Sequence, residues 1–320
     1  MQDMKPGLLL IGEATPRMIE RMRAAFTLHI WEEIADQAAF LAGPGQEIAY
    51  IATNGHDGVK PEIMSAMPAL KVIACYGVGY DAIDANAAAA RGVIVTHTPN
   101  VLNDDVANTA IMLMLACYRS LVRDDAYVRA GRWAAEGNAP LTRSPERRTV
   151  GILGLGRIGL RIAEKLAAFD ATILYHARSE KNAPYRYCAD LVQMATEADV
   201  LICITPGGAE TAKLVDREVM DALGPDGVLI NVARGSVVDE TELVAALKEG
   251  RLGYAGLDVF EAEPNVPEAL FAMDNVTLLP HVGSATEETR QAMGDLVVDN
   301  LIAHKERGDT ISPVPECKSL

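Results

Sequence analysis

The sequence predicts an α/β protein made of two domains, each a doubly wound parallel sheet. Short apolar runs alternate with longer amphipathic stretches along the 320 residues, and a glycine-rich turn follows one of the runs. The length suits two domains, and an apolar content of 49% is ample for two packed interiors. Such alternation is typical of parallel sheets whose two faces are covered by helices.

Ten apolar runs are predicted to form buried strands, in two series. The first series is Leu8–Ile11, Ile48–Ala52, Val72–Cys75 and Val93–Thr96. The second series is Val150–Leu153, Thr172–Tyr175, Val200–Ile204, Val228–Val232, Gly256–Val259 and Thr277–Leu279. We expect the six strands of the second series to form a complete doubly wound sheet.

Helices are predicted between the strands from composition and capping signals. The stretch from Asp104 to Arg119, and on toward Gly131, is rich in Ala, Leu and Met and predicts a long helix that could bridge two domains. The letters S-A-T-E predict that the last helix opens at Ser284, and D-E-T-E predicts a similar cap at Asp239.

Net charge and cysteine content exclude several classes of binding partner. Acidic residues outnumber basic ones 44 to 29, which gives a net charge of -15 and excludes a typical nucleic-acid binder. The five cysteines are scattered and never form C-x-x-C, so they indicate neither a disulfide framework nor a zinc site, and no metal is expected. With no basic leader and no apolar run long enough to span a bilayer, we expect a cytoplasmic protein without membrane contact.

A nucleotide site is predicted at Gly154, Gly156 and Gly159, which fit G-x-G-x-x-G directly after a strand. The first glycine permits the turn, the second admits a pyrophosphate, and the third lets the helix pack on the strand. N–H groups at the helix start then bind the anion. The alternative is a tight turn without a ligand, but strand, motif and helix occur in the order that binding requires.

The end of the next strand favours NADP over NAD, although NAD stays possible. A chain that binds NAD usually has an acid there for the ribose hydroxyls, whereas this chain has Ala177, followed by Arg178 and Ser179. A carboxylate that would repel a ribose phosphate is missing, and a cation that would pair with it is present. The alternative is an arginine that is merely solvated at a strand end.

Arg234, Glu263 and His281 together could reduce a carbonyl group. Arg234 suits the carboxylate of a 2-oxo acid, because a guanidinium can hold two oxygens. His281 could donate the proton, and Glu263 could favour the protonated imidazole and fix its tautomer. Each follows a predicted strand, at the edge where such sheets bind ligands. Taken singly, His281 could equally be structural and Glu263 a turn residue.

A second glycine-containing turn, C-Y-G-V-G-Y-D, runs from Cys75 to Asp81 after a predicted strand. Its N–H groups could form an anion site for the substrate carboxylate. An ordinary tight turn is the alternative.

These motifs resemble those of the D-isomer-specific 2-hydroxyacid dehydrogenase family along nearly the whole chain. The resemblance implies a Rossmann cofactor domain, residues 99–285, inserted in a flavodoxin-like substrate domain, residues 1–98 and 286–320, with the active site in the cleft. It implies that Val78 and Gly79, with Arg234 and His281, bind the substrate, and that Asp258 lies near the nicotinamide amide. The further cofactor contacts that it implies are at Arg157, Ile158, Thr205, Pro206, Thr211, Val232, Ala233 and Gly283.

The resemblance also implies a homodimer formed through the long helices of the cofactor domain. Trp133 would reach toward the partner's cleft or simply fill the interface. Two departures from relatives are Asn108, where many carry an acid, and T-P-G-G-A-E-T at Thr205–Thr211, where relatives often read P-L-T-P-E-T.

Within the family, the sequence is most similar to NADPH-using glyoxylate/hydroxypyruvate reductases and to plant-type hydroxyphenylpyruvate reductases. It therefore predicts NADPH-dependent reduction of small 2-oxo acids to D-2-hydroxy acids, with glyoxylate and hydroxypyruvate foremost. Hydroxyphenylpyruvate or phenylpyruvate is the alternative substrate. Formate oxidation is disfavoured, because formate dehydrogenases pair their His with Gln where Glu263 stands. A non-catalytic nucleotide-sensing protein is the alternative from another class.

Overall fold

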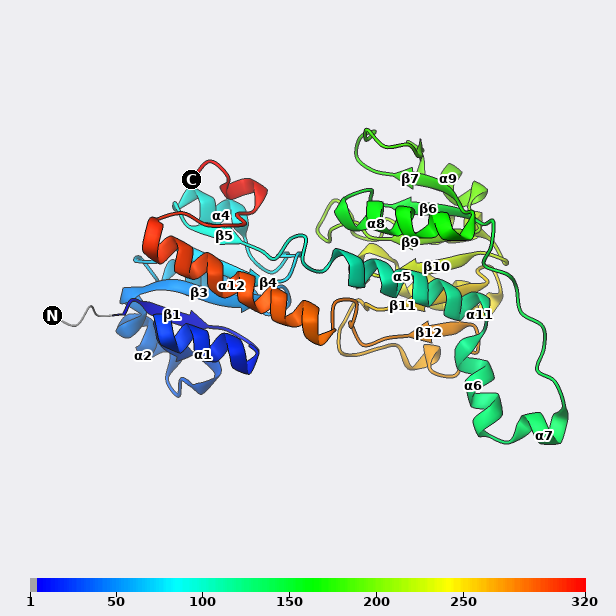
Figure 1. The fold of residues 1–320 in the computed structure, drawn as a ribbon, viewed down its shortest axis with the longest axis horizontal. Coiled ribbons are helices and arrows are strands. Elements are labelled where there is room, and N and C mark those ends of the chain that lie inside the picture. Colours follow the sequence, from blue (N-terminus) through cyan, green and yellow to red (C-terminus); the bar gives the residue numbers. More distant parts are fainter. Residues whose placement is uncertain (1–4) are drawn as a thin grey trace. The chain divides into compact units, whose positions relative to one another are not determined.

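The computed structural model describes residues 5–320, which divide into two compact units. One unit consists of the chain up to Leu102 together with Ala285–Leu320, and the other of Asn103–Ser284. The domain boundaries that the family resemblance implies, after residues 98 and 285, lie within a few residues of these divisions. Figure 1 shows the course of the chain through both units.

The first unit contains a five-stranded sheet in the order β2-β1-β3-β4-β5, in which every paired strand is parallel. Its strands are β1 Gly7–Leu10, β2 Thr27–Ile30, β3 Ile48–Asn54, β4 Val72–Tyr76 and β5 Ile94–Thr96. Its α-helices are α1 Pro16–Ala25, α2 Gln37–Ala42, α3 Pro61–Ser65, α4 Ala85–Ala90 and α12 Glu287–Arg307.

Helices cover both faces of this sheet because its strands are apolar on both sides. Leu8 and Leu10 of β1 pack in a cluster with residues of α1 and α12, whereas Leu9 packs in another with residues of α3 and α4. Side chains alternate along a strand, so consecutive leucines bury opposite faces. In Figure 1, α1 and α12 lie on the same face of the sheet.

The second unit contains a seven-stranded sheet in the order β12-β11-β10-β9-β6-β7-β8, with every pair parallel. Its strands are β6 Thr149–Leu153, β7 Thr172–His176, β8 Arg186–Tyr187, β9 Val200–Cys203, β10 Val228–Asn231, β11 Tyr254–Leu257 and β12 Val276–Leu278. Its α-helices are α5 Asn103–Tyr118, α6 Leu121–Arg129, α7 Arg132–Glu136, α8 Arg157–Leu166, α9 Leu191–Glu197, α10 Arg217–Leu223 and α11 Glu240–Glu249.

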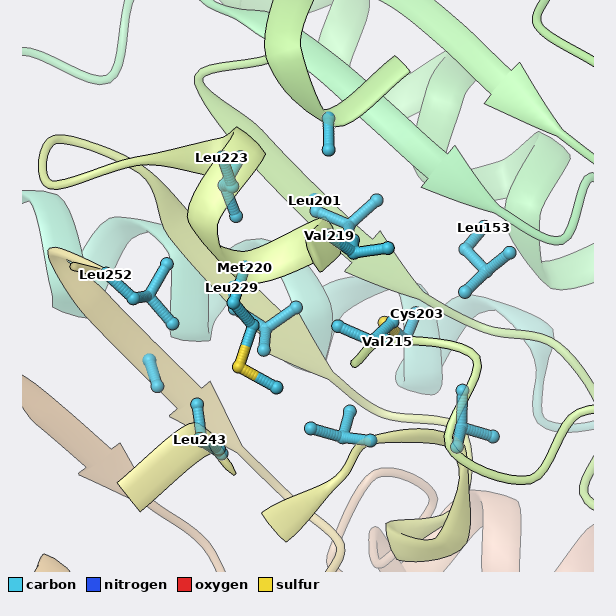
Figure 2. Close-up of a cluster of buried hydrophobic side chains, with 14 of the residues drawn as sticks. Leu153, Leu201, Cys203, Val215, Val219, Met220, Leu223, Leu229, Leu243 and Leu252 are labelled. Carbon is cyan, nitrogen blue, oxygen red and sulfur yellow. The ribbon is translucent and has the colours of Figure 1, made fainter. Parts of the chain in front are cut away.

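One core of this unit lies between the sheet and α9, α10 and α11. Figure 2 shows Leu201 and Leu229 of the central strands facing Val219 and Met220 of α10. The opposite face is covered by α5 and α8 (Figure 1). There Gly256 of β11 lets α5 approach closely, since an added Cβ would lie 3.0 Å from the Cβ of Leu113.

All ten predicted strands are present, which confirms the fold class, but two further strands were missed. β2 is half exposed along its length, and β8 has only two residues, so neither gives a clear apolar run. Both lie at sheet edges, where burial leaves the weakest sequence pattern.

Two helix predictions need correction and one is confirmed. The predicted continuous helix toward Gly131 is interrupted at Ser120, whose φ of 46° is incompatible with a right-handed helix. The last helix is capped by Thr286 rather than Ser284, because the N–H of Thr289 donates to the Thr286 hydroxyl at 3.2 Å. The cap at Asp239 is confirmed.

No single helix among residues 5–320 is long and apolar enough to cross a membrane. One bent pair, α5 with α6 at 62°, meets the requirement by length and composition alone.

Candidate active site

His281 and Glu263 meet at the carboxyl end of the seven-stranded sheet. His281 follows β12, and its Nδ1 lies 2.7 Å from Glu263 Oε2. Its N–H donates to the Asp258 carbonyl oxygen at 2.8 Å, and its φ is 53°. The structure thus confirms the predicted contact between the two side chains, although their catalytic roles stay predictions.

The Glu263 carboxylate fixes which ring nitrogen of His281 is available. Burial acts to raise the pKa of Glu263. Hydrogen bonds from His281 and the Phe260 N–H, together with the nearby charges of His281 and Arg234, act to lower it. The lowering effects prevail, so the pKa lies below its ordinary value. An ionised carboxylate only accepts, so Nδ1 of His281 carries a proton. Nε2 is therefore the atom that can exchange a proton with a ligand, and the His281 side chain is 47% exposed.

Arg234 is placed by a turn that the sequence did not reveal. It follows β10, whose last residue, Asn231, is buried. The Asn231 side chain donates to the Arg234 carbonyl oxygen at 3.0 Å and accepts from the Ala233 N–H at 3.1 Å. The guanidinium donates to the Ala233 carbonyl oxygen at 2.7 Å. A polar residue ending the apolar run V-L-I-N was the only sequence signal for this turn.

The turn of Arg234 packs directly against the loop of Glu263. An added Cβ on Gly235 would lie 1.9 Å from the carbonyl carbon of Phe260, so only glycine fits there. Glu240, the first residue of α11, accepts a hydrogen bond from the Glu261 N–H at 3.1 Å. The turn of Arg234 and the loop of Glu263, which are distant in sequence, are therefore held in a fixed position relative to each other.

Asp258 organises the loop between His281 and Gly283. It is 2% exposed, and its carboxylate accepts from the N–H groups of Val282 and Gly283 at 2.7 and 2.8 Å. Burial raises the pKa of Asp258, and these two hydrogen bonds oppose that shift without cancelling it. An added Cβ on Gly283 would lie 2.9 Å from this carboxylate.

The glycine turn between β6 and α8 has the shape that a pyrophosphate needs. Gly154 has φ 108° and lies against the Thr205 backbone, and an added Cβ on Gly159 would lie 2.2 Å from the Gly154 carbonyl oxygen. Apart from its own chain neighbours, an added Cβ on Gly156 would meet no heavy atom of residues 5–320 within 4 Å, and no side chain of these residues caps the first N–H groups of α8. The residues thus fit a dinucleotide at this helix start, where Arg157 and Ile158 begin α8.

The predicted ribose site lies at the end of β7. Ala177 directly follows the strand, and Arg178 is 91% exposed. Arg178 lies 3.6 Å from the carboxylate of Glu210, a partner that no pattern in the sequence indicates. Because both side chains are exposed, this ion pair contributes little stability and leaves the guanidinium accessible to a phosphate.

The other predicted cofactor contacts follow the neighbouring strands. Thr205 and Pro206 follow β9, and the Thr211 hydroxyl donates to the Pro206 carbonyl oxygen at 2.8 Å. Val232 and Ala233 follow β10 and are buried. Their contacts with a cofactor stay predictions.

Val78 and Gly79 belong to the other unit, in the turn after β4, and are partly exposed. Their contact with a substrate carboxylate also stays a prediction. Residues 5–320 contain no group of three or more His, Cys, Asp or Glu that could hold a metal ion.

Comparison with known proteins identifies the family. Residues 111–283 match the family model described as D-isomer specific 2-hydroxyacid dehydrogenase, NAD binding domain. The hydroxyphenylpyruvate reductase of Plectranthus scutellarioides is 46% identical over 310 residues, which are 96% of this chain and 98% of that protein. The 2-ketogluconate reductase of Gluconobacter oxydans is 45% identical, over 97% of this chain and 99% of the relative.

A solved structure has a similar fold over nearly the whole length of the chain. The NADPH-dependent glyoxylate/hydroxypyruvate reductase of Sinorhizobium meliloti, in complex with NADP and malonate, is 48% identical with a TM-score of 0.92, covering 98% of each chain. This similarity extends across both units of the chain. The chain belongs to the D-isomer specific 2-hydroxyacid dehydrogenase family and contains its NAD-binding domain.

Proposed function

We propose that this protein uses NADPH to reduce small 2-oxo acids to D-2-hydroxy acids, with glyoxylate and hydroxypyruvate as preferred substrates. The observation that carries the proposal is the 2.7 Å contact between His281 Nδ1 and Glu263, formed on an NAD-binding domain beside the turn of Arg234. The relatives that are named reductases of 2-oxo acids support it.

The chain's own residues would bind, orient and protonate the substrate. When bound, the reduced nicotinamide supplies the hydride. The Arg234 guanidinium holds the carboxylate of the oxo acid and turns its carbonyl toward His281. His281 Nε2 then donates a proton to the carbonyl oxygen, and the Glu263 carboxylate stabilises the imidazolium before that transfer. Asp258 keeps the loop of His281 in place through its two backbone hydrogen bonds.

The NADP preference rests on the end of β7. Ala177 presents no carboxylate, and Arg178 presents an exposed guanidinium with only a weak ion pair at 3.6 Å. This arrangement suits a ribose phosphate. The Sinorhizobium meliloti reductase, whose structure holds NADP, supports the same preference.

Hydroxyphenylpyruvate is the second candidate substrate, and the 46% identical relative from Plectranthus scutellarioides favours it. Initial rates with glyoxylate, hydroxypyruvate, hydroxyphenylpyruvate and 2-ketogluconate, each with NADPH and NADH, test the assignment. We expect the highest kcat/KM with hydroxypyruvate or glyoxylate and NADPH, and a D-configured product. A protein that reduces none of these acids would refute the proposed function.

We propose that the protein is a homodimer formed through the face of α5, α6 and α8. A groove of about 550 Å³ opens on this face and is largely apolar. It is lined by Asn108, Ile111, Met112, Leu115, Ala116, Arg119, Leu121, Lys165 and Phe169. Met112 and Leu121 are 48% and 58% exposed, and Trp133 in α7 is 59% exposed. Exposed apolar side chains that gather around one apolar groove, as Met112 and Leu121 do, are typical of an interface.

Sedimentation velocity tests the dimer. Wild type should sediment as a dimer, and Met112→Glu with Leu121→Glu should sediment as a monomer, because each substitution would bury a charge in an apolar interface. Phe271→Glu, at a side chain that is 64% exposed elsewhere in this unit, is the control. A monomeric wild type, or a double variant that stays dimeric, would refute this interface.

We also propose a cytoplasmic location. All five cysteines are free and buried, as expected for a protein that folds in a reducing compartment. Fractionation of the source cells tests this proposal, which recovery of the protein outside the cytoplasm would contradict.

A further inference from the structure

In the turn that follows β4, the carbonyl oxygens accept hydrogen bonds, whereas two of the N–H groups donate none within residues 5–320. The Gly77 carbonyl oxygen accepts from the Thr98 N–H at 2.8 Å, and that of Gly79 accepts from Cys75 Sγ at 3.5 Å. By contrast, the N–H groups of Val78 and Gly79 find no acceptor within residues 5–320. Two successive open N–H groups on a partly exposed turn favour an anion such as a carboxylate.

The remaining carbonyl of the turn, that of Val78, is bound by His97. His97 Nδ1 lies 2.9 Å from the Val78 oxygen. A carbonyl oxygen only accepts, so Nδ1 is the donor. His97 is 7% exposed and directly follows β5, the neighbour of β4, so its ring reaches the turn from the adjacent strand end. The ring of Tyr80 packs edge-on against it, with centroids 5.6 Å apart at 89°.

The chain after α12 holds the backbone of His97 through two hydrogen bonds. The His97 N–H donates to the Ser312 carbonyl oxygen at 3.2 Å, and the Ser312 hydroxyl donates to the His97 carbonyl oxygen at 2.6 Å. Asn300 of α12, which is fully buried, donates to the same hydroxyl at 2.9 Å. The Tyr80 hydroxyl donates to Glu316 at 3.1 Å. The segment from Ser312 to Glu316 therefore holds the backbone of His97 and the hydroxyl of Tyr80.

We propose that His97 is a positioning residue: it holds the Val78 carbonyl so that the Val78 and Gly79 N–H groups bind the carboxylate of the 2-oxo acid, with the segment from Ser312 to Glu316 as its brace. The inference rests on the proposed function, because it assigns a carboxylate substrate to these N–H groups. His97 itself neither touches the substrate nor transfers a proton. Its effect should therefore fall on substrate affinity rather than on the rate of the chemical step.

Two substitutions at His97 separate positioning from a general structural role. His97→Leu removes the donor while keeping an apolar side chain, whereas His97→Asn keeps an N–H donor near the position of Nδ1. We expect His97→Leu to raise KM for glyoxylate and hydroxypyruvate about tenfold, with kcat and KM for NADPH within about twofold of wild type. His97→Asn should restore most of the lost affinity.

Malonate supplies a measurement that needs no turnover. Calorimetric titration of the protein with malonate in the presence of NADP⁺ should give a weaker affinity for His97→Leu and nearly wild-type affinity for His97→Asn. Tyr80→Phe should weaken malonate binding by a smaller factor, because it frees the turn only from Glu316. The matched control is Tyr50→Phe, which loses a tyrosine hydrogen bond of 3.1 Å between β3 and His304 of α12 and should leave the affinity unchanged.

The outcomes distinguish this inference from the proposed function. An active wild type whose His97→Leu variant keeps its KM and its malonate affinity would overturn the role of His97 alone. Equal losses in kcat, NADPH affinity and substrate affinity that His97→Asn does not rescue would also overturn it, since they indicate general disruption. A wild type that reduces no 2-oxo acid would refute the proposed function, and malonate binding would then still decide whether His97 orients an anion site.

Discussion

His281 has a backbone conformation that few residues other than glycine adopt. Its φ of 53° costs on the order of 1–3 kcal/mol, which the surrounding contacts must offset. The N–H bond to the Asp258 carbonyl and the side-chain bond to Glu263 hold the residue in that conformation. A strained residue whose ring is nonetheless 47% exposed is more consistent with a catalytic role than with a structural one.

Glu263 gives a prediction for stability against pH. The pKa of its carboxyl is lower in the folded protein than its ordinary value, so its stabilising contribution is complete above the unfolded pKa, about 4.3, and is lost as pH falls through the folded value. Glu263→Gln should therefore lower the thermal midpoint near neutral pH, and the difference from wild type should shrink at acid pH. Thermal unfolding from pH 7 downward measures this.

The control for that experiment is Glu306→Gln, at an exposed position of α12, which should change the midpoint little at any pH. A difference between wild type and Glu263→Gln that grows as the solution is acidified would contradict the assigned direction of the pKa shift.

The residues of the site could be predicted where one side chain stood out in an apolar setting. Arg234, Glu263 and His281 did so, and the contact between the last two is confirmed. Asn231, Gly235 and His97 could not be found in this way, because each acts on the backbone of another residue. Their importance depends on distances between segments that are far apart in sequence.

At the scale of elements, the turn between β6 and α8 gives two glycines with opposite requirements. The space beside Gly156 is open, whereas an added Cβ on Gly159 would lie 2.2 Å from a carbonyl oxygen. Gly156→Ala should keep the thermal midpoint and weaken NADPH binding, about tenfold or more, because the methyl group projects where a pyrophosphate would approach. Gly159→Ala should lower the midpoint by several degrees, since overpacking costs about 1–3 kcal/mol.

Thermal unfolding without cofactor, together with fluorescence titration with NADPH, separates these two effects. A Gly156→Ala variant that binds NADPH as tightly as wild type would show that the pyrophosphate lies elsewhere.

The end of β7 gives a prediction for cofactor choice. Replacing Ala177 with Asp and Arg178 with Leu introduces a repulsive carboxylate and removes the cation. The ratio of kcat/KM with NADPH to that with NADH should fall about tenfold to a hundredfold, because charge-assisted hydrogen bonds contribute about 1.5–3 kcal/mol. Arg186→Leu, which removes another exposed arginine of the same unit from its ion pair with Glu197, is the control. An unchanged ratio would show that the ribose site is misplaced.

Element boundaries followed from the sequence wherever burial was complete. The central strands β9 and β10 are buried at every residue and were found with nearly correct limits. The half-exposed β2, the two-residue β8 and the break at Ser120 were not found. In the last case apolar residues stand on both sides of Ser120, whose φ is positive, and no glycine or proline marks the break.

At the scale of the whole molecule, alternation of strands and helices predicted two parallel-sheet units, and the structure contains both. The chain leaves the first unit after Leu102 and returns at Ala285. The family resemblance, rather than composition or periodicity, supplied this inserted arrangement. A sequence pattern shows which strands are buried but not which sheet receives the last helix, so the arrangement could not be derived from the residues alone.

We expect His281, oriented by Glu263, to protonate a 2-oxo acid during its reduction by NADPH. Stopped-flow measurement of NADPH oxidation with saturating hydroxypyruvate, for wild type and His281→Gln, tests it most directly. We expect rapid oxidation by wild type and a rate about 10²- to 10⁴-fold lower in the variant, with the affinity for NADPH unchanged. Equal rates in the two proteins, or no oxidation by wild type, would contradict the claim.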